Sequence, residues 1–254
     1  MLRICGCCKA TEGFARISFL QERKVARLRA RFYIFLLCAG VVFNTFFGII
    51  IALMLKLGVM VSGRGSNLQA ILDAVSAKKI PAAVSVVLSN KDCPALERAR
   101  KASVPAVFID AKGKTREEYD ELVLSELKKH GVELVVFAGY FRLVSKKFVE
   151  AYRNKIINIH PSLLPAFPGG LSDAQKRALE WGVKVTGCTV HFVDEGEDTG
   201  AIILQKAVEV KDDDNADSLS ARILGKEHEA LVEAVKAIAE NRVKIKGRRV
   251  VIDL

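Results

Sequence analysis

Beyond Met54, short apolar runs alternate with stretches whose apolar residues recur at helical spacing. The run Leu57–Val61 is followed by residues 68–75, where apolar side chains at i, i+3, i+4 and i+7 predict a helix with one buried face. This alternation predicts an α/β fold with a single doubly wound, mostly parallel sheet. Residues 183–193 and 201–210 predict the two arms of an antiparallel extension. The other predicted strands are 83–88, 106–109, 134–138 and 156–159. The other predicted helices are 94–102, a helix that begins with the capping box Thr115–Glu118, a short helix from Ser145, 172–182 and about 218–240.

The first 53 residues differ in composition from the rest of the 254-residue chain. They carry eight basic and two acidic residues, which give a net charge of +6 out of the chain's +10. Residues 32–55 contain no charge, and this run of 24 residues is long enough to cross a bilayer. We therefore predict two parts: 1–53, a basic and apolar segment unlike the rest, and 54–254, a single domain. A translation start misassigned upstream of Met54, a membrane anchor and a targeting segment are the open explanations of the first part.

Charge and cysteine content restrict the function of residues 54–254. A net charge of only +4 remains there, and the basic residues form no stripe with interleaved aromatic side chains, so we expect no nucleic-acid partner. Two of the six cysteines, Cys93 and Cys188, lie in this part, which is too few for a disulfide framework and fits a reducing compartment. No zinc spacing occurs, so no metal is expected. We expect a cytoplasmic protein, or a membrane-associated one if residues 32–55 are a transmembrane segment.

A glycine-rich turn, Ser62-Gly-Arg-Gly-Ser-Asn67, lies between the first predicted strand and its helix. Its glycines let a ligand approach the backbone, and the free N–H groups of Gly65, Ser66 and Asn67 begin the helix, where the partial positive charge favours a phosphate. The turn is neither a dinucleotide fingerprint nor a Walker loop, because Leu68 occupies the third glycine position and no Gly-Lys-Ser/Thr follows. A plain turn capped by Ser66 is the alternative.

Asn158 and His160 are two residues apart at the end of a predicted strand, so both side chains point to one face. The carboxyl end of such a strand is where open α/β sheets bind ligands, and we expect both side chains to reach a cleft there. The histidine could transfer protons near neutral pH, and the amide could donate to an oxyanion. A structural histidine in a proline-rich turn is the alternative. Asp198, in an acidic loop, is the carboxylate expected to pair with His160, raise its pKa and fix its tautomer.

The remaining histidines are weaker candidates. His130 precedes a helix-ending glycine and His191 lies within a predicted strand, so we predict structural roles for both. His228 follows Glu227 on the last predicted helix, and an isolated Glu-His pair is more typical of packing or solvation than of a metal site. The sequence contains no Gly-x-Ser-x-Gly elbow of a hydrolase.

Taken in order, these motifs resemble those of the phosphoribosylglycinamide formyltransferases, the folate-dependent enzymes of de novo purine synthesis. The motifs are Ser62-Gly-Arg-Gly-Ser-Asn-Leu-Gln69, Ala138-Gly-Tyr-Phe-Arg-Leu-Val-Ser145, Asn158-Ile-His-Pro-Ser-Leu-Leu-Pro165, Gly187-Cys-Thr-Val-His-Phe-Val193, Asp198-Thr-Gly200 and Glu227-His228. The resemblance runs from about Met54 to the C-terminus, and residues 1–53 have no counterpart in it. It implies that residues 54–254 form the Rossmann-like formyltransferase domain of this family.

The resemblance also implies an activity. The amine of glycinamide ribonucleotide, N1-(5-phospho-D-ribosyl)glycinamide, would attack the formyl carbon of 10-formyltetrahydrofolate directly, without a metal or a covalent enzyme intermediate. Asn158 and protonated His160 would stabilise the tetrahedral oxyanion, with Asp198 keeping the pKa of His160 high enough for proton transfer. Both partners would be small molecules, and the enzyme would be a monomer or a homodimer.

Binding residues follow from the same resemblance. The phosphate would be held by Gly65, Ser66 and Asn67, and Glu227 would contact the same substrate. The formyl-folate would be bound by the loop ending at Asp198 and by Arg116, Phe141, Arg142, Leu143, Val144 and Asn158. One departure is the segment Pro168–Asp173, which lacks a histidine that often follows Phe-Pro-Gly in the family.

Three other functions remain open at this point. Formyltetrahydrofolate hydrolase and methionyl-tRNA formyltransferase have a similar Asn-x-His…Asp set, but the hydrolase would carry a folded regulatory domain in front. The tRNA enzyme would need an RNA-binding domain after the last predicted helix. A non-catalytic, membrane-tethered binding protein with the same fold is the third, and the presence of Asn158, His160 and Asp198 together speaks against it.

Overall fold

The computed structural model describes residues 54–169 and 174–253. The chain divides into two units, Met1–Leu53 and Met54–Leu254, and the second contains every described residue. The predictions for residues 1–53, and for all but the end of the apolar stretch 32–55, lie outside the described residues. Within the two described ranges, no helix is long and apolar enough to span a membrane.

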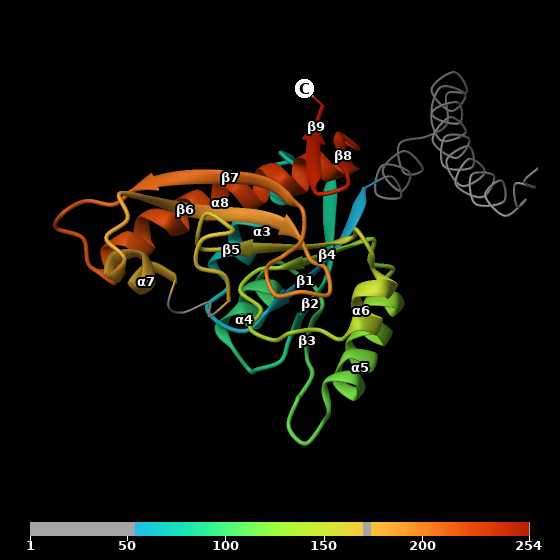
Figure 1. Cartoon of the computed structure of the whole chain (residues 1–254). Coiled ribbons are helices and arrows are strands. Elements are labelled where there is room, and N and C mark those ends of the chain that lie inside the picture. The colour runs from blue at the N-terminus through green and yellow to red at the C-terminus, as the bar shows by residue number, and fades with distance from the viewer. Residues whose placement is uncertain (1–53, 170–173, 254) are drawn as a thin grey trace, which may run out of the picture. The chain divides into compact units, whose positions relative to one another are not determined.

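One sheet organises the described residues. Its strands are β1 Leu55–Val61, β2 Ala82–Ser89, β3 Ala106–Phe108, β4 Leu134–Phe137, β5 Ile156–His160, β6 Val185–Phe192, β7 Ile202–Glu209, β8 Val243–Lys246 and β9 Arg249–Ile252. Their order is β3-β2-β1-β4-β5-β6-β7-β9-β8 (Figure 1). The strands β1 to β5 pair in parallel, whereas β6 is antiparallel to both β5 and β7. The predicted parallel sheet with an antiparallel extension is therefore confirmed.

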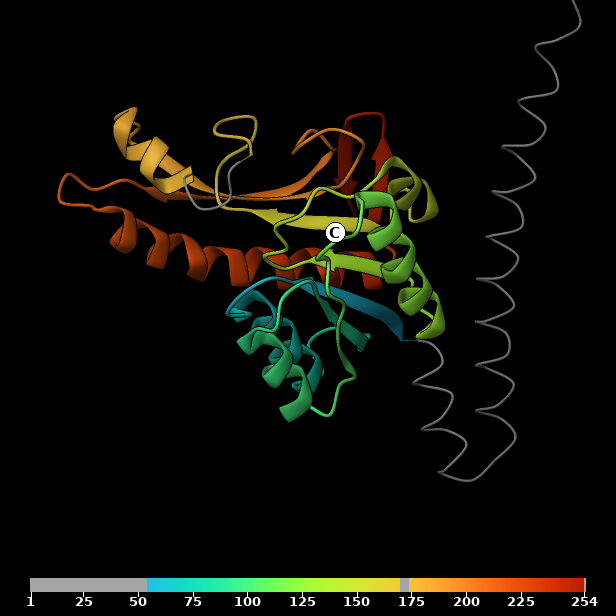
Figure 2. The ribbon, with the colours of Figure 1, turned by 90° about the horizontal axis from the view of Figure 1, so that it is seen from below.

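Helices cover both faces of this sheet. They are α3 Ser66–Ser76, α4 Pro94–Lys101, α5 Arg116–Lys129, α6 Lys146–Ala151, α7 Ala174–Glu180 and α8 Ala216–Ala239. Alternate residues of β1 enter two separate apolar clusters: Leu57 and Val59 pack with α3, α4 and α8, whereas Met60 packs with α5 and α6. Figure 2 shows α8 along the same face as α3 and α4. Because both faces are covered, the parallel strands are apolar almost throughout.

Local sequence signals account for several helix ends. The capping box predicted at Thr115 is present, because the Thr115 side chain accepts the N–H of Glu118 and the Glu118 carboxylate accepts the N–H of Thr115. The predicted last helix, α8, has Asn215 as its N-cap, with a similar reciprocal pair of hydrogen bonds to Ser218. The Leu164–Pro165 peptide bond is cis.

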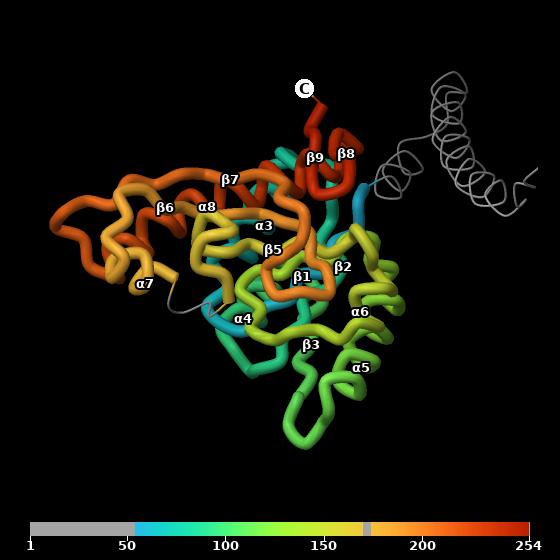
Figure 3. The backbone as a smooth tube through the Cα atoms, viewed as in Figure 1, coloured from blue at the N-terminus to red at the C-terminus, as the bar shows by residue number. Residues whose placement is uncertain are grey.

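The sequence predicted nothing beyond the last helix, but β8 and β9 form an antiparallel hairpin there, and β9 adjoins β7 (Figure 3). Gly247, with φ 62°, allows the tight turn between them. Each strand has only four residues, and its exposed positions mix charged side chains with Ile245 and Val251. A pattern this short carries too few apolar residues to indicate a strand without its partner.

The loops that follow β1 and β4 meet where the strand order reverses, the position at which open α/β sheets bind ligands. Ser62, directly after β1, joins them: its N–H donates to the Gly139 carbonyl at 2.9 Å. Its hydroxyl accepts the N–H of Phe141 at 3.0 Å and donates to the Asn90 carboxamide at 2.6 Å. The two loops are thus fixed relative to each other by one buried side chain that the sequence did not single out.

Candidate active site

A cleft of about 450 Å³ opens beside the carboxyl ends of β4 and β5. Residues 140–144 form one wall, and the loop 194–198 between β6 and β7 forms the other. All six residues predicted to bind the formyl-folate line this cleft: Arg116, Phe141, Arg142, Leu143, Val144 and Asn158. Phe141 and Leu143 are 52% and 53% exposed, so the cleft presents apolar surface that a flat ring could cover.

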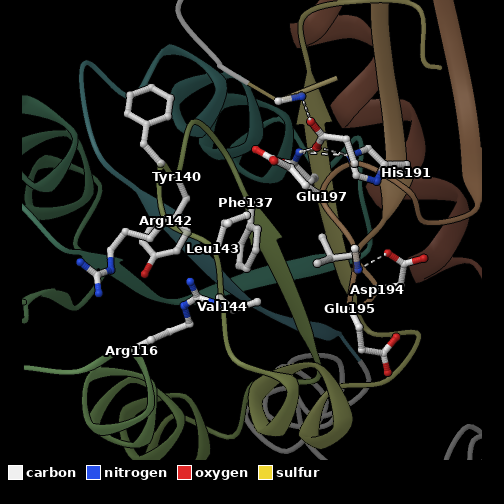
Figure 4. A pocket seen from close by; sticks show the side chains of 16 residues that line it. Arg116, Phe137, Tyr140, Arg142, Leu143, Val144, His191, Asp194, Glu195 and Glu197 are labelled. Atoms are coloured by element: carbon white, nitrogen blue, oxygen red, sulfur yellow. Dashed lines mark hydrogen bonds and ion pairs between the residues drawn. The ribbon is translucent and has the colours of Figure 1, made fainter. Parts of the chain in front are cut away.

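The walls of this first cleft carry opposite charges. Arg116 and Arg142 lie on one side, and the acidic residues 194–198 lie on the other (Figure 4). The Arg142 guanidinium is held over the ring of Tyr119, 4.5 Å from its centroid. The neighbouring Asp120, almost fully buried, accepts the N–H of Ser145 at the end of the wall. The helix α5 therefore fixes the 140–144 segment from behind.

A second cleft of about 480 Å³ lies at the N-terminus of α3. It is lined by all four residues predicted to bind the ribonucleotide: Gly65, Ser66, Asn67 and Glu227. The helix begins after Gly65, which has φ 73°, and no side chain caps it. The alternative that Ser66 caps this turn is therefore wrong, and the first N–H groups of α3 are left for a ligand.

Two glycines leave open space for a ligand in the second cleft. A Cβ on Gly63 or Gly139, both in its lining, would meet no other atom within 4 Å. Deeper in the cleft, Glu227 on α8 accepts a hydrogen bond from Asn67 Nδ2 at 2.8 Å and is only 8% exposed. Burial raises the pKa of Glu227, and the hydrogen bond from Asn67 offsets this only in part.

The raised pKa of Glu227 predicts a pH-dependent stability. The folded state binds this proton more tightly than the unfolded chain, so the stability associated with it is present at low pH and is lost as pH rises through the folded pKa. We expect Glu227→Gln to be more stable relative to the unmodified protein at pH 8 than at pH 4.5, in urea unfolding. The matched control is Glu229→Gln, because Glu229 lies two residues further and pairs with Lys226 at 2.9 Å on the surface. An equal difference for Glu227→Gln at both pH values would contradict the prediction.

The two clefts adjoin at Phe141, which lines both, and a polar cluster reaches the first cleft through Asn158 and Asp198. Asp198 lies between two imidazoles: Oδ2 is 3.2 Å from Nδ1 of His160, and Oδ1 is 3.4 Å from Nε2 of His191. Asn158 Nδ2 lies 3.1 Å from His191 Nε2 and 3.5 Å from Asp198 Oδ1. The structure thus brings the three predicted catalytic residues together.

His191, predicted to be structural, belongs to this cluster. In the antiparallel pair of β5 and β6 it lies directly opposite Asn158. Its Nδ1 donates to the Phe192 carbonyl at 2.8 Å, and the ring is 2% exposed. The only sequence signal for His191 is its place within the motif Gly187–Val193. Its pairing with Asn158 depends on strand register, which the sequence pattern does not specify.

His160 is more enclosed than predicted. It has no exposed surface and is absent from the lining of the first cleft, which Asn158 reaches. Its Nε2 donates to the Phe167 carbonyl at 2.9 Å, so Nδ1 faces the Asp198 carboxylate. Nδ1 lies 3.2 Å from the carboxylate but makes no hydrogen bond to it. Because Nε2 carries a proton, a neutral His160 would direct the lone pair of Nδ1 at the carboxylate, which is unfavourable. A proton on Nδ1 removes this repulsion, so this geometry favours the imidazolium.

Burial opposes that charge. It lowers the pKa of His160, and the negative charge of Asp198 and the Phe167 carbonyl offset the effect only in part. As expected, the charge of Asp198 raises the pKa of His160. The pKa is nevertheless lowered overall, because burial is the larger effect. Burial also raises the pKa of Asp198, but hydrogen bonding from His191, the charge of His160 and the Gly169 N–H at 2.8 Å together hold it below its usual range. Asp198 is therefore ionised at neutral pH.

Among the residues that the structure describes, no group of three or more His, Cys, Asp or Glu side chains is placed to hold a metal ion. The two described cysteines, Cys93 and Cys188, are both free. Burial raises the pKa of Cys188 to about 12, which leaves its thiol protonated and unreactive.

Comparison with known proteins identifies the family of this chain. Residues 55–235 match the formyl transferase family. The chain is 46% identical over 194 residues to the trifunctional purine biosynthetic protein adenosine-3 of Drosophila melanogaster, covering 75% of this chain and 14% of that protein. It is 40% identical over 187 residues to phosphoribosylglycinamide formyltransferase of Bacillus subtilis, covering 73% of this chain and 95% of that one.

A solved structure, glycinamide ribonucleotide transformylase 1 from Symbiobacterium toebii, superimposes with a TM-score of 0.76 at 50% identity, over 79% of this chain and 94% of that one. The chain spans only 14% of the trifunctional relative but nearly the whole of the bacterial enzymes. The chain belongs to the formyl transferase family and, within it, to the phosphoribosylglycinamide formyltransferases.

Proposed function

We propose that this protein transfers the formyl group of 10-formyltetrahydrofolate to the amine of glycinamide ribonucleotide, a step of purine synthesis. The pair of adjoining clefts is the observation that carries the proposal, because a direct transfer needs two substrates bound with their reacting atoms in contact. Phe141 lines both clefts, and Asn158 and Asp198 lie on the floor of one of them. Every residue involved belongs to the unit Met54–Leu254.

The first cleft suits the formyl-folate. Its apolar wall, Phe141 to Val144, offers a surface for the fused ring, and Arg116 and Arg142 offer cations for the carboxylates of the tail. The second cleft suits the ribonucleotide: the uncapped N-terminus of α3 would bind the phosphate, and buried Glu227 would bind a ribose hydroxyl. No metal takes part in this proposal.

The chemistry proceeds by addition and elimination. The amine nitrogen bonds to the formyl carbon, and the carbonyl oxygen becomes an oxyanion to which Asn158 Nδ2 donates. Protonated His160 supplies the second donor by exchanging its bond with the Phe167 carbonyl for one with the substrate, and Asp198 balances its charge. The intermediate then expels the folate nitrogen, which gains a proton as the attacking amine loses one.

Turnover measured with the full chain tests this function. We expect consumption of 10-formyltetrahydrofolate only when glycinamide ribonucleotide is present, with one formylated ribonucleotide formed per folate consumed. Asn158→Ala serves as the inactive control. Folate consumption that continues without the ribonucleotide would instead identify a formyltetrahydrofolate hydrolase, and absence of both reactions would identify a binding protein.

A further inference from the structure

The second cleft contains a single basic side chain among the described residues, Arg64. Arg64 lies in the glycine-rich turn between β1 and α3, with Gly63 and Gly65 on either side. Its side chain is exposed and takes part in no ion pair within the described ranges, so it is available to a ligand. It takes no part in the proposed transfer chemistry.

The charges in this cleft favour a cation beside an anionic ligand. Two carboxyl groups line it, Asp217 in the first turn of α8 and Glu227 further along the same helix. The N-terminus of α3 contributes only about half a positive charge. Arg64 is the side chain that offsets these carboxyl groups, so its loss would weaken the attraction of the α3 N-terminus for a phosphate.

The backbone of Arg64 is fixed from the far side of the turn by Arg98 on α4. Arg98 Nε donates to the Arg64 carbonyl at 2.8 Å, and Arg98 Nη1 donates to the Gln69 carboxamide at 3.1 Å. One guanidinium thus joins the turn to the first helical turn of α3. Arg98 lies in the groove between α3 and α4, on the opposite side of the turn from the ligand cleft.

The start of α4 supports the same turn through its backbone and a small side chain. The N–H of Ala95 donates to the Gly63 carbonyl at 3.2 Å. The Ala95 Cβ would lie 2.6 Å from a Cβ on Gly65, so α4 packs directly against the turn. Contacts with α4 therefore fix the backbone of Arg64, and with it the point from which the side chain extends.

We propose that Arg64 sets the preference of this enzyme for a phosphorylated amine substrate, and that Arg98 is the positioning residue that holds Arg64 at the mouth of the cleft. The inference rests on the proposed function, since it names the group that recognises the phosphate of that substrate. Arg64 pairs with the phosphate oxygens that the α3 N–H groups leave free. Arg98 acts only through the Arg64 carbonyl and Gln69, because a guanidinium can hold both at fixed geometry and an ammonium cannot.

Steady-state kinetics of the full chain test the two roles. We expect Arg64→Gln to raise the KM for glycinamide ribonucleotide by about 10-fold or more, the loss of one charge-assisted contact. Its kcat and its KM for 10-formyltetrahydrofolate should stay within about twofold. Arg98→Gln should raise the same KM less, and Arg98→Lys should fail to restore it despite keeping the charge. The double variant should resemble Arg64→Gln alone, because Arg98 acts through Arg64.

The matched control is Arg100→Gln, two residues along α4, where the guanidinium pairs with Glu97 on the surface. It should leave every constant unchanged. An unchanged KM for the ribonucleotide in Arg64→Gln would overturn the role of Arg64. Full restoration by Arg98→Lys, or additive effects in the double variant, would overturn the positioning role of Arg98.

Binding of ribose 5-phosphate, measured by calorimetry against ribose, separates this inference from the proposed function. Arg64→Gln should weaken the binding of ribose 5-phosphate and leave that of ribose unchanged. If the unmodified chain shows no transfer activity but Arg64→Gln still weakens ribose 5-phosphate binding, the proposed function fails and the inference about phosphate stands. If transfer is normal and the binding of ribose 5-phosphate is unchanged in Arg64→Gln, the inference fails alone.

Discussion

Replacing His160 with alanine is expected to lower kcat by about 10²- to 10⁴-fold, the range for loss of a general acid. The imidazolium carries both the second oxyanion donor and the proton for the leaving nitrogen, and Asn158 alone cannot supply the proton. Each KM should change only a few-fold, because His160 has no exposed surface and lies outside the lining of both clefts. Single-turnover kinetics with both substrates saturating would measure the chemical step directly.

His130→Ala is the matched control for this variant. His130 ends α5, lies 3.6 Å from the partly buried Glu126 and lines neither cleft, so kcat should not change. Asp198→Asn provides a second variant in case the alanine leaves a cavity that unfolds the protein, since an amide oxygen can still accept the Gly169 N–H. It removes the negative charge that opposes the effect of burial, so the pKa of His160 should fall further. The loss of activity with rising pH should then begin at a lower pH. A kcat within threefold of the unmodified value in both folded variants would overturn the mechanism.

Gly65→Ala is expected to destabilise the protein by about 2 to 5 kcal/mol, from a left-handed conformation that costs about 1–2 kcal/mol and overpacking that costs about 1–3 kcal/mol. Gly65 has φ 73°, and an added Cβ would lie 2.6 Å from the Ala95 Cβ and 2.9 Å from its Cα. Because backbone is part of that contact, rotation of a side chain cannot relieve it. Urea unfolding followed by circular dichroism would measure the loss.

Two other glycines separate the causes of that loss. Gly113 also has φ 73°, but a Cβ there would meet nothing within 4 Å, so Gly113→Ala should show the conformational cost alone, about 1 kcal/mol. At Gly63 the Cβ direction is likewise open, and the φ is not left-handed. Gly63→Ala should therefore keep its stability within about 0.5 kcal/mol and instead raise the KM for the ribonucleotide, because its methyl group enters the second cleft. A Gly65→Ala protein no less stable than Gly113→Ala would show that α4 does not press on the turn.

Local patterns in the sequence determined the order and type of most elements. Apolar residues at helical spacing and short apolar runs indicate a helix or a strand wherever the partner surface lies, and the cap at Thr115 specifies its helix end by contacts three residues apart. The turn Ser62–Asn67 was recognisable for the same reason, because its glycines serve a local backbone geometry. The β8–β9 hairpin was missed because four-residue strands depend on their partner more than on their own pattern.

The composition of the active site was decided by the tertiary structure. His191 joins the cluster because the register of β5 and β6 places it opposite Asn158, and a shift of one residue would have turned its side chain to the other face. Asp198 meets His160 from 38 residues away because the loop between β6 and β7 folds back over β5. The sequence alone specifies which chemical groups are present and the local backbone that carries each. Which of these groups touch and how deeply they are buried is set only in the folded chain, because register and burial are properties of packed elements. The pKa of His160 is an example, since burial lowers it more than Asp198 raises it.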